Sequence, residues 1–217
     1  MTYLEAINKV LRRLREDEVT APNETAYSRL ISELVNDANH LVENAWDWTE
    51  LRSTRPVTLS TGSTIGSITG LSDNYKVLSV YNATKKSLVN LGTEKEYFDS
   101  VYINNVARGT PANYLPQGFS DMENTTASFV FYPPSDGSYT LVFDVVDRSN
   151  DLVLASSLIR TSGLAVVQLA HAMAVEERGE SGGQPAALLY VTANSTLSDA
   201  IAYDVARRPT EAVWYDV

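Results

Sequence analysis

Histidine and cysteine are the side chains that most often bind metals or act in catalysis, and this 217-residue chain has two histidines and no cysteine. His40 lies three residues from both Asp37 and Glu43, and a carboxylate–histidine pair could bind a metal ion or move a proton. His171 lies among alanines, with Glu176 five residues further on, which is not a metal-ligand spacing. A solvated helix face explains His40 better, and a buried or interface position explains His171 better. The sequence therefore predicts no metal site.

Three glycines, Gly62, Gly66 and Gly70, are spaced by four residues, with Ser and Thr between them. A phosphate-binding loop needs Gly-Lys-Ser/Thr at the start of a helix, and this segment has none. Ser67 follows Gly66 directly, whereas a nucleophilic serine needs Gly-x-Ser-x-Gly and a histidine to take its proton. We interpret the glycines as turns or a bulge.

Two acidic pairs, Asp144 with Asp147 and Glu176 with Glu177, could do acid–base chemistry if a cleft brought them to a substrate. Their positions, in a predicted strand and at a predicted helix end, specify no such cleft. The sequence therefore predicts a protein that is not an enzyme, with no catalytic residue and no cofactor.

The net charge of −10 is concentrated in the two ends of the chain, and the middle is nearly neutral. An acidic surface repels phosphate, so tight nucleic-acid binding is not expected; the charge either serves solubility or lets nucleic acid pass without sticking. No window approaches 18 consecutive apolar residues, so no membrane span is predicted. The start, Met1–Glu5, leads into a helix and does not resemble a signal peptide.

Residues 1–50 are predicted to form a helical hairpin. Thr2 is a candidate N-cap with Glu5 at the capping-box position, and the first helix should stop near Asp17. Asn23 or Thr25 can cap the second helix. A short connection between two amphipathic helices implies that they are antiparallel. Apolar residues recur at helical spacing in both: Leu4, Ile7, Val10, Leu11 and Leu14, then Tyr27, Leu30, Ile31, Leu34, Ala38, Leu41, Val42 and Ala45.

Residues 51–150 lose the helical period, and Thr, Ser, Gly, Asn and Pro separate short apolar runs. One short helix over 94–103 is expected after Thr93, its N-cap. The clearest signal is a hairpin in which Ala127–Tyr132 and Ser138–Asp147 flank the turn residues Pro133–Gly137. Its second strand has two apolar faces, which predicts burial on both sides. The further candidate strands are Arg55–Ser60, Thr64–Leu71, Lys76–Tyr81 and Ser87–Leu91.

Residues 151–217 are predicted to be helical again, with a helix that ends at Gly179 and another that starts near Pro185 and stops at Pro209. The alternation of helical, β and helical parts predicts an α+β fold. In that fold, about four helices from both chain ends form an antiparallel bundle, and the β part is a small inserted sheet or sandwich. The apolar stripe of the last helix is Leu188, Val191, Leu197, Ile201 and Val205.

Three segments together resemble one family, the head-to-tail adaptor proteins of short-tailed phages (tail tubular protein A of the T7 type). They are Ile7–Glu16 followed by Val19, Ala45–Trp48 at the end of the second helix, and Phe129–Asp136 followed by Tyr139–Leu141. The resemblance runs from residue 4 to about 206. Arg15 and Ala45 stand where the family usually has Gly, and Pro133-Pro134 shifts the family's hairpin proline.

The resemblance implies a virion protein at the head–tail junction, made in the host cytoplasm. It implies a ring of twelve copies between the portal protein and the tail tube or nozzle, through which DNA passes without specific binding. Family members grip the portal with terminal segments, which implies that Trp214 and Tyr215 dock there after Pro209. Trp and Tyr are also enriched at interface hot spots.

Other residues are assigned by type and place in the sequence. Trp46 and Trp48 are expected to anchor the bundle to the β part. Asp199 and Asp204 on the last helix are candidates for the surface of the ring's bore. Aromatic residues of the β part are candidates for tail-side or subunit contacts: Tyr97, Phe98, Tyr102 and Tyr114.

Two further hypotheses remain open from the sequence. One is another tail-completion or terminator protein of a phage tail, which would differ from an adaptor in ring symmetry and place. The other is a carbohydrate- or cell-wall-binding module, or a hydrolase that uses an acidic pair, either of which would act as a monomer.

Overall fold

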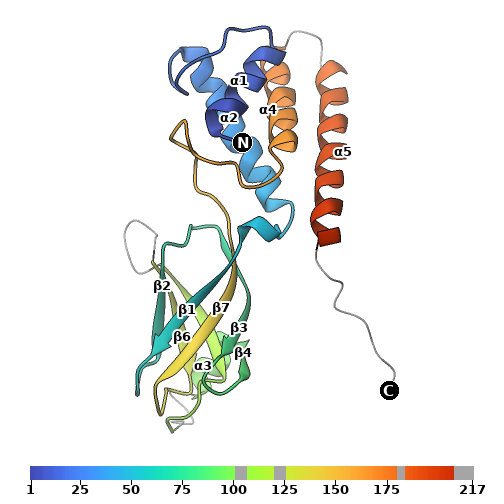
Figure 1. The fold of residues 1–217 in the computed structure, drawn as a ribbon. Helices are drawn as coiled ribbons and strands as arrows, with labels where there is room; N and C mark the ends of the chain where they lie inside the picture. Colours follow the sequence, from blue (N-terminus) through green and yellow to red (C-terminus); the bar gives the residue numbers. More distant parts are fainter. Residues whose placement is uncertain (101–106, 120–125, 180–183, 208–217) are drawn as a thin grey trace, which may run out of the picture. The chain divides into compact units, whose positions relative to one another are not determined.

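A computed structural model describes residues 1–100, 107–119, 126–179 and 184–207 (Figure 1). The chain divides into two compact units. The helical unit combines residues 1–51 with those that follow residue 150, and the β unit is Arg52–Asn150.

The helical unit is organised around α4, which packs against α1, α2 and α5. The inner residues of α4 are mostly small, and Ala165, Ala170, Ala172 and Ala174 are buried. Small side chains let neighbouring helices approach closely, so one helix can contact three others. The helices are α1 (Tyr3–Arg13), α2 (Ala26–Asn44), α4 (Gly163–Arg178) and α5 (Gln184–Arg207), with a short 3-10 helix, η1 (Thr49–Leu51).

The helix starts follow the capping chemistry that the sequence predicts. The Thr2 hydroxyl accepts the Glu5 N–H at 3.2 Å, and the Glu5 carboxylate accepts the Thr2 N–H at 2.9 Å. Thr25, one of the two predicted caps, forms the same reciprocal pair with Ser28 at the start of α2. Gly179 ends α4 in the left-handed conformation. The first helix ends earlier than predicted, at Arg13.

The segment 151–159, here called the strap, is bound along the start of α1. The first N–H groups of a helix have no partner inside it. The N–H of Tyr3 therefore donates to the Ser157 carbonyl at 2.8 Å, and the N–H of Leu4 donates to the Ala155 carbonyl at 3.2 Å. The Ile159 N–H donates to the Met1 carbonyl at 3.0 Å. These bonds tie residues from the two ends of the chain into one unit.

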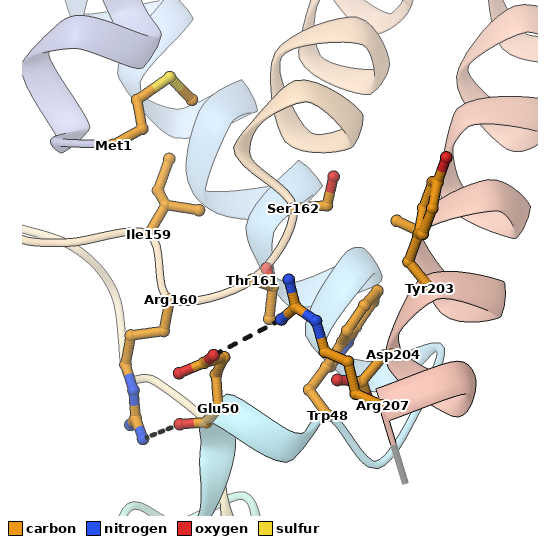
Figure 2. Close-up of a pocket in the computed structure, with 11 residues that line it drawn as sticks. Met1, Trp48, Glu50, Ile159, Arg160, Thr161, Ser162, Tyr203, Asp204 and Arg207 are labelled. Carbon is orange, nitrogen blue, oxygen red and sulfur yellow. Dashed lines mark hydrogen bonds and ion pairs between the residues drawn. The ribbon is translucent and has the colours of Figure 1, made fainter.

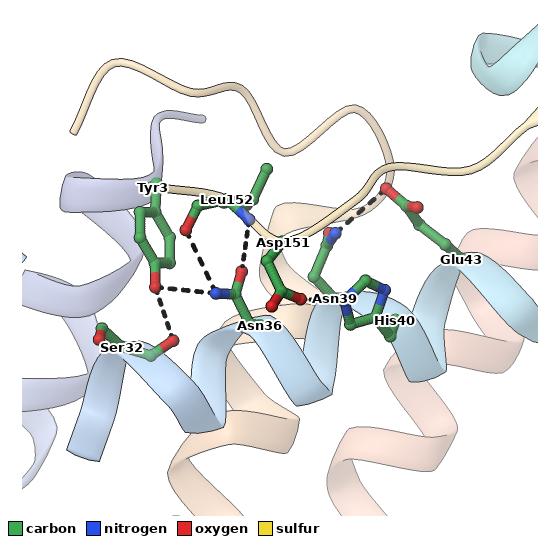
Figure 3. A network of polar contacts seen from close by, with 8 residues as sticks. All are labelled: Tyr3, Ser32, Asn36, Asn39, His40, Glu43, Asp151 and Leu152. Carbon is green, nitrogen blue, oxygen red and sulfur yellow. Dashed lines mark hydrogen bonds and ion pairs between the residues drawn. The ribbon is translucent and has the colours of Figure 1, made fainter. Parts of the chain in front are cut away.

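Asn36 on α2 holds the beginning of the strap (Figure 3). Its amide accepts the Leu152 N–H at 2.9 Å and donates to the Leu152 carbonyl at 3.2 Å, so it pairs both backbone groups of one residue. The same amide donates to the Tyr3 hydroxyl at 3.1 Å. The His40 ring contacts the Asp151 carboxylate at 2.7 Å. His40 therefore helps to hold the start of the strap against α2.

The β unit is a seven-stranded sheet in the order β1-β7-β3-β4-β5-β6-β2. All pairs are antiparallel except β4 with β5. The edge strands β1 and β2 lie beside each other, so the sheet is nearly closed and barrel-like. Its elements are β1 (Arg52–Leu59), β2 (Ile65–Thr69), β3 (Tyr75–Asn82), β4 (Ser87–Leu91), α3 (Glu94–Phe98), β5 (Asn113–Phe119), β6 (Thr126–Tyr132) and β7 (Tyr139–Asp147).

The interior of the β unit is a cluster of aromatic side chains. Phe129, Phe131 and Phe143 are fully buried, and the rings of Phe129 and Phe143 lie 4.7 Å apart. Gly66 lets β2 close against this core, because a Cβ there would lie 2.8 Å from Val57 Cγ1 and 3.0 Å from Phe131 Cε2. The predicted turn or bulge is therefore wrong for Gly66, which needs its small size for packing within a strand.

The fold class predicted from the sequence, α+β with a bundle of about four helices and a small inserted sheet, is wrong. The structure is a mixed α/β fold whose sheet has seven strands, a nearly closed form and a core of its own. The sequence predicts neither β5 nor the return of β2 to β1. The apolar stripe of α5 also does not form a bundle core, because Leu188 and Val191 are exposed.

The predicted hairpin is wrong as well, although both of its strands exist. β6 lies between β5 and β2, and β7 lies between β1 and β3. The turn residues instead cross to the β1–β2 connection, where the Gly62 N–H donates to the Ser135 carbonyl at 2.7 Å. The core face of β7 is buried, as predicted. On its second face, burial is confirmed for Val146, whereas Val142 is half-buried.

We predict that Phe143→Ala destabilises the β unit by about 3–5 kcal/mol, because it removes a ring at the centre of the aromatic core. Leu88→Ala on β4 removes a side chain that is 66% exposed and should change stability by about 0.5 kcal/mol or less. Urea unfolding of the two variants measures both values. Equal losses would contradict the position of the core.

Candidate interaction site

Helix α5 packs through a narrow inner face. Ala186, Ala193 and Asp204 are buried, and their spacings of 7 and 11 residues place them on one side of the helix. This side faces α4, against which α5 packs. The Tyr190 hydroxyl also donates to the Glu176 carboxylate of α4 at 2.6 Å. Burial, together with this hydrogen bond, raises the pKa of Tyr190 to about 12.

The opposite side of α5 exposes large apolar side chains among small polar ones. Leu188, Val191 and Tyr203 are 68%, 65% and 73% exposed, and Ser195 and Asp199 between them are exposed too. Val191, Ser195 and Asp199 follow one another at intervals of four residues and therefore form one ridge along the helix. Tyr203, one turn further on, lines the cavity beside Asp204 that is described below. We call Leu188, Val191, Ser195 and Asp199 the outer face of α5.

Helix α5 has fewer charged side chains than a solvated helix normally has. Its 24 residues contain only three charged side chains, Asp199, Asp204 and Arg207. Asp204 is buried, so Asp199 alone gives the outer face a charge. The solvent-facing side of a surface helix normally carries many charged side chains. The outer face of α5 therefore has the composition of a surface that another chain covers.

Asp204, one of the residues that line the pocket in Figure 2, joins the end of α5 to the end of α2. It is 4% exposed, and its carboxylate accepts the Trp46 Nε1–H and the Thr49 N–H, both at 3.1 Å. Thr49 begins η1, so the carboxylate pairs an amide that η1 leaves open. Trp48 is buried next to this junction, and its Nε1–H donates to the Val42 carbonyl at 2.8 Å.

A cavity of about 480 Å³ lies beside the junction, between α5 and the segment that leads into α4. Arg160 Nη2 donates to the Glu50 carbonyl at 2.9 Å, and Arg207 lies 3.8 Å from the Glu50 carboxylate. Glu50, Arg160 and Asp204 thus connect segments of the protein. Over the described part of the chain, no three or more His, Cys, Asp or Glu side chains are grouped so as to hold a metal ion.

The structure separates the two acids predicted to face a bore. Asp199 is exposed on the outer face of α5, whereas Asp204 is inside the junction and unavailable to a surface. Trp46 and Trp48 both hydrogen-bond within the helical unit. Their predicted role as anchors for the β part stays a prediction.

The predicted aromatic contacts of the β unit fall into two groups. Phe98 on α3 is 52% exposed and Tyr97 is half-buried, so both can meet a partner. Tyr114 is buried in the core of the β unit, which excludes it from a surface contact within this fold. The remaining predicted residues, Tyr102, Trp214 and Tyr215, lie outside the described residues.

A groove of about 590 Å³ between α1 and the strap was not predicted. Ala155 and Ser156 line it from the strap, and Glu18 lines it from the chain that follows α1. The residues that line it from α1 are Leu4, Glu5, Asn8, Lys9 and Arg12. The sequence did contain a signal, because this acidic chain places four basic residues within positions 9–15. The strap adds exposed apolar side chains nearby: Val153, Leu154 and Leu158.

His171 lies between α1 and α5 and not at a reactive site. It lines a small pocket with Arg13 and Leu189, and it is half-buried. Burial lowers the pKa of the imidazole, and the charge of Arg13 lowers it further. This placement fits the predicted buried or interface position.

The outer face of α5 exposes large apolar side chains on a helix with few charges, which is the character of a surface that other chains cover. The sequence matches the family described as SU10 adaptor protein over residues 1–212. The chain belongs to this family, which is a family of phage head-to-tail adaptors. The resemblance to head-to-tail adaptors is thereby confirmed, and the protein is a phage structural component.

No curated protein matches the sequence. Within the described ranges, no helix combines the length and the apolar character that crossing a membrane requires.

We predict that Asp204→Asn destabilises the helical unit by about 1–3 kcal/mol. The Trp46 and Thr49 donors lose a charged acceptor, and the amide NH2 that replaces the other oxygen faces the Thr49 N–H. Asp17→Asn, at an exposed acid of the same unit, should have little effect. Urea unfolding followed by tryptophan fluorescence compares them, since Trp46 and Trp48 lie at the junction. A loss no larger than that of the control would show that the buried carboxylate is dispensable.

The folded-state pKa of His171 lies below its ordinary value of 6.5, so the unfolded chain binds more protons than the folded one as the pH falls below 6.5. We therefore expect stability to decline from pH 6.5 downward, before the carboxylates titrate. His171→Gln should flatten this part of the curve. Urea midpoints at half-unit steps from pH 7.5 to 5 measure the slope, and an unchanged slope in the variant would contradict the assignment.

Proposed function

We propose that the protein is a non-enzymatic connector of the virion, which forms a ring between the portal and the tail tube or nozzle of a phage. Twelve copies are the number that the resemblance implies. The ring sits at the head–tail junction and surrounds part of the channel through which DNA leaves the head. Membership of the adaptor family supports this role.

The outer face of α5 is the observation that carries the ring. It exposes Leu188 and Val191 on a helix with one exposed carboxylate, Asp199. Burial of apolar surface is the main driving force of association, and identical subunits most often cover such faces with one another in closed symmetry.

Two parts of the chain are assigned different partners. Trp214 and Tyr215 dock on the portal, in keeping with the terminal segments that family members use. Phe98 and Tyr97 on α3 contact the tail side or a neighbouring subunit. Both pairs supply the aromatic surface that is enriched at the centres of interfaces.

The channel needs a wall that does not retain phosphate. The net charge of −10 supports this property, because like charges repel across the bore.

The experiment is light scattering and negative-stain imaging of the purified chain, alone and mixed with the portal protein encoded in the same genome. We expect a ring that caps the portal. Deleting residues 210–217 should abolish capping, because it removes both aromatic side chains of the tail. A Glu211→Ala/Asp216→Ala chain, which keeps the tail's length and aromatics, should still cap it.

A chain that stays monomeric and ignores the portal would overturn the proposal. A sixfold or threefold ring with no affinity for the portal would instead support a terminator farther down the tail. Glycan binding by the monomer would support a wall-binding module.

A further inference from the structure

Two surface ridges of the helical unit have the same order of side chains at the same spacing. On α1, Leu4 and Arg12 are eight residues apart, and on α5, Val191 and Asp199 are eight residues apart. Eight residues of α-helix span about 12 Å. Each ridge thus has an apolar side chain at its start and a charged one at its end, and the two charges are opposite.

The ridge on α1, formed by Leu4, Asn8 and Arg12, is one wall of a preformed groove. Asn8, in the middle of the ridge, donates to the Val19 carbonyl and accepts the Val19 N–H, both at 2.9 Å. These bonds hold the chain that follows α1 beside the helix. The strap forms the other wall, since the Ala155 carbonyl accepts the Leu4 N–H at 3.2 Å. The groove therefore exists before any partner arrives.

The groove and the outer face of α5 belong to different sides of the helical unit. Helix α4 packs against α1 and α2 and also against α5, and it lies between them (Figure 1). One copy therefore cannot fill its own groove with its own outer face. Two unlike surfaces on one subunit produce head-to-tail association, which closes into a ring when the rotation between copies permits.

We infer that the outer face of α5 of one copy packs into the α1 groove of the next copy, with the two helices parallel. This inference rests on the proposed ring and names its subunit interface. Val191 lies against Leu4 and the strap, and Asp199 lies against Arg12 and Lys9. In this arrangement, Asp199 serves the interface and not the bore.

The charges at the groove support a second copy as the occupant. Arg12 is paired with Glu18 at 2.8 Å, but both side chains are more than half exposed, and such a pair contributes little. Lys9 is exposed one turn earlier. Glu5 also lines the groove, seven residues before Arg12, which is about 10 Å along the helix. A carboxylate from another copy that arrives at the Arg12 end would therefore meet Arg12 and Lys9 first.

The test uses two charge reversals in the full chain, Asp199→Arg and Arg12→Glu. Each one places like charges together at every interface, so each should weaken ring formation at least tenfold, as measured by sedimentation over a concentration series and by rings on the portal. Asp37→Arg, at an exposed acid of α2, is the matched control and should assemble as the original chain does. Circular dichroism and urea midpoints confirm that each variant is folded.

An equimolar mixture of the two reversed chains should form rings again. The arginine introduced on α5 of one chain then meets the glutamate introduced on α1 of the next. The following interface is the original pair of Asp199 with Arg12, so the two kinds of chain alternate around the ring. An α5-to-α5 interface would instead leave the Arg12→Glu chain able to associate by itself.

Cysteine cross-linking gives an independent readout, because the chain has no cysteine of its own. A chain with Leu4→Cys and Val191→Cys should form a ladder of disulfide-linked oligomers after oxidation. A chain with Asp37→Cys and Val191→Cys should not.

Rings on the portal that are unaffected by both charge reversals, with no ladder, would overturn the interface, leave the connector role standing and return Asp199 to the bore. If the unsubstituted protein forms no ring, alone or on the portal, both proposals are overturned.

Discussion

The first amide groups of α1 have no acceptors within their own helix, and the structure of the helical unit depends on how they are satisfied. The carbonyls of Ser157 and Ala155, which come more than 150 residues later in the chain, accept the N–H groups of Tyr3 and Leu4. Asn36 then pairs both backbone groups of Leu152. Because buried backbone groups must be paired, these hydrogen bonds determine the position of the strap. The groove along α1 follows directly from that placement.

The sequence predicted what local chemistry decides. Thr2 and Thr25 begin helices because a hydroxyl three residues before an open amide satisfies it, and this requires no knowledge of the fold. Partner strands are a different matter. The turn residues after Tyr132 showed correctly that a strand ends there, but the strand that follows pairs with β1 and β3. That choice depends on closing the sheet around the phenylalanine core, whose residues come from strands far apart in the sequence. A short stretch of sequence does not show this closure, and the predicted fold class was wrong for the same reason.

The candidate site shows the same division. Apolar residues at helical spacing on the last helix predicted a buried stripe, and Asp204 was expected at a surface. In the structure Leu188 and Val191 of this stripe are exposed and Asp204 is buried. Asp204 can be buried because its donors come from Trp46 and Thr49, about 155 residues away in the chain. Leu188 and Val191 remain exposed because Ala186 and Ala193 already fill the contact with α4. Periodicity identified the helix but could not tell which side meets its own chain and which side meets another.

The near closure of the sheet has a consequence for how the β unit can meet its neighbours. Strands β1 and β2, the two ends of the strand order, lie side by side. An open strand edge presents rows of hydrogen-bonding groups to which any extended segment can add. Crowding many copies into one particle would make such edges a route to fibrous aggregates. In this unit the two outermost strands shield each other, so recognition through side chains such as Phe98 is favoured over backbone pairing.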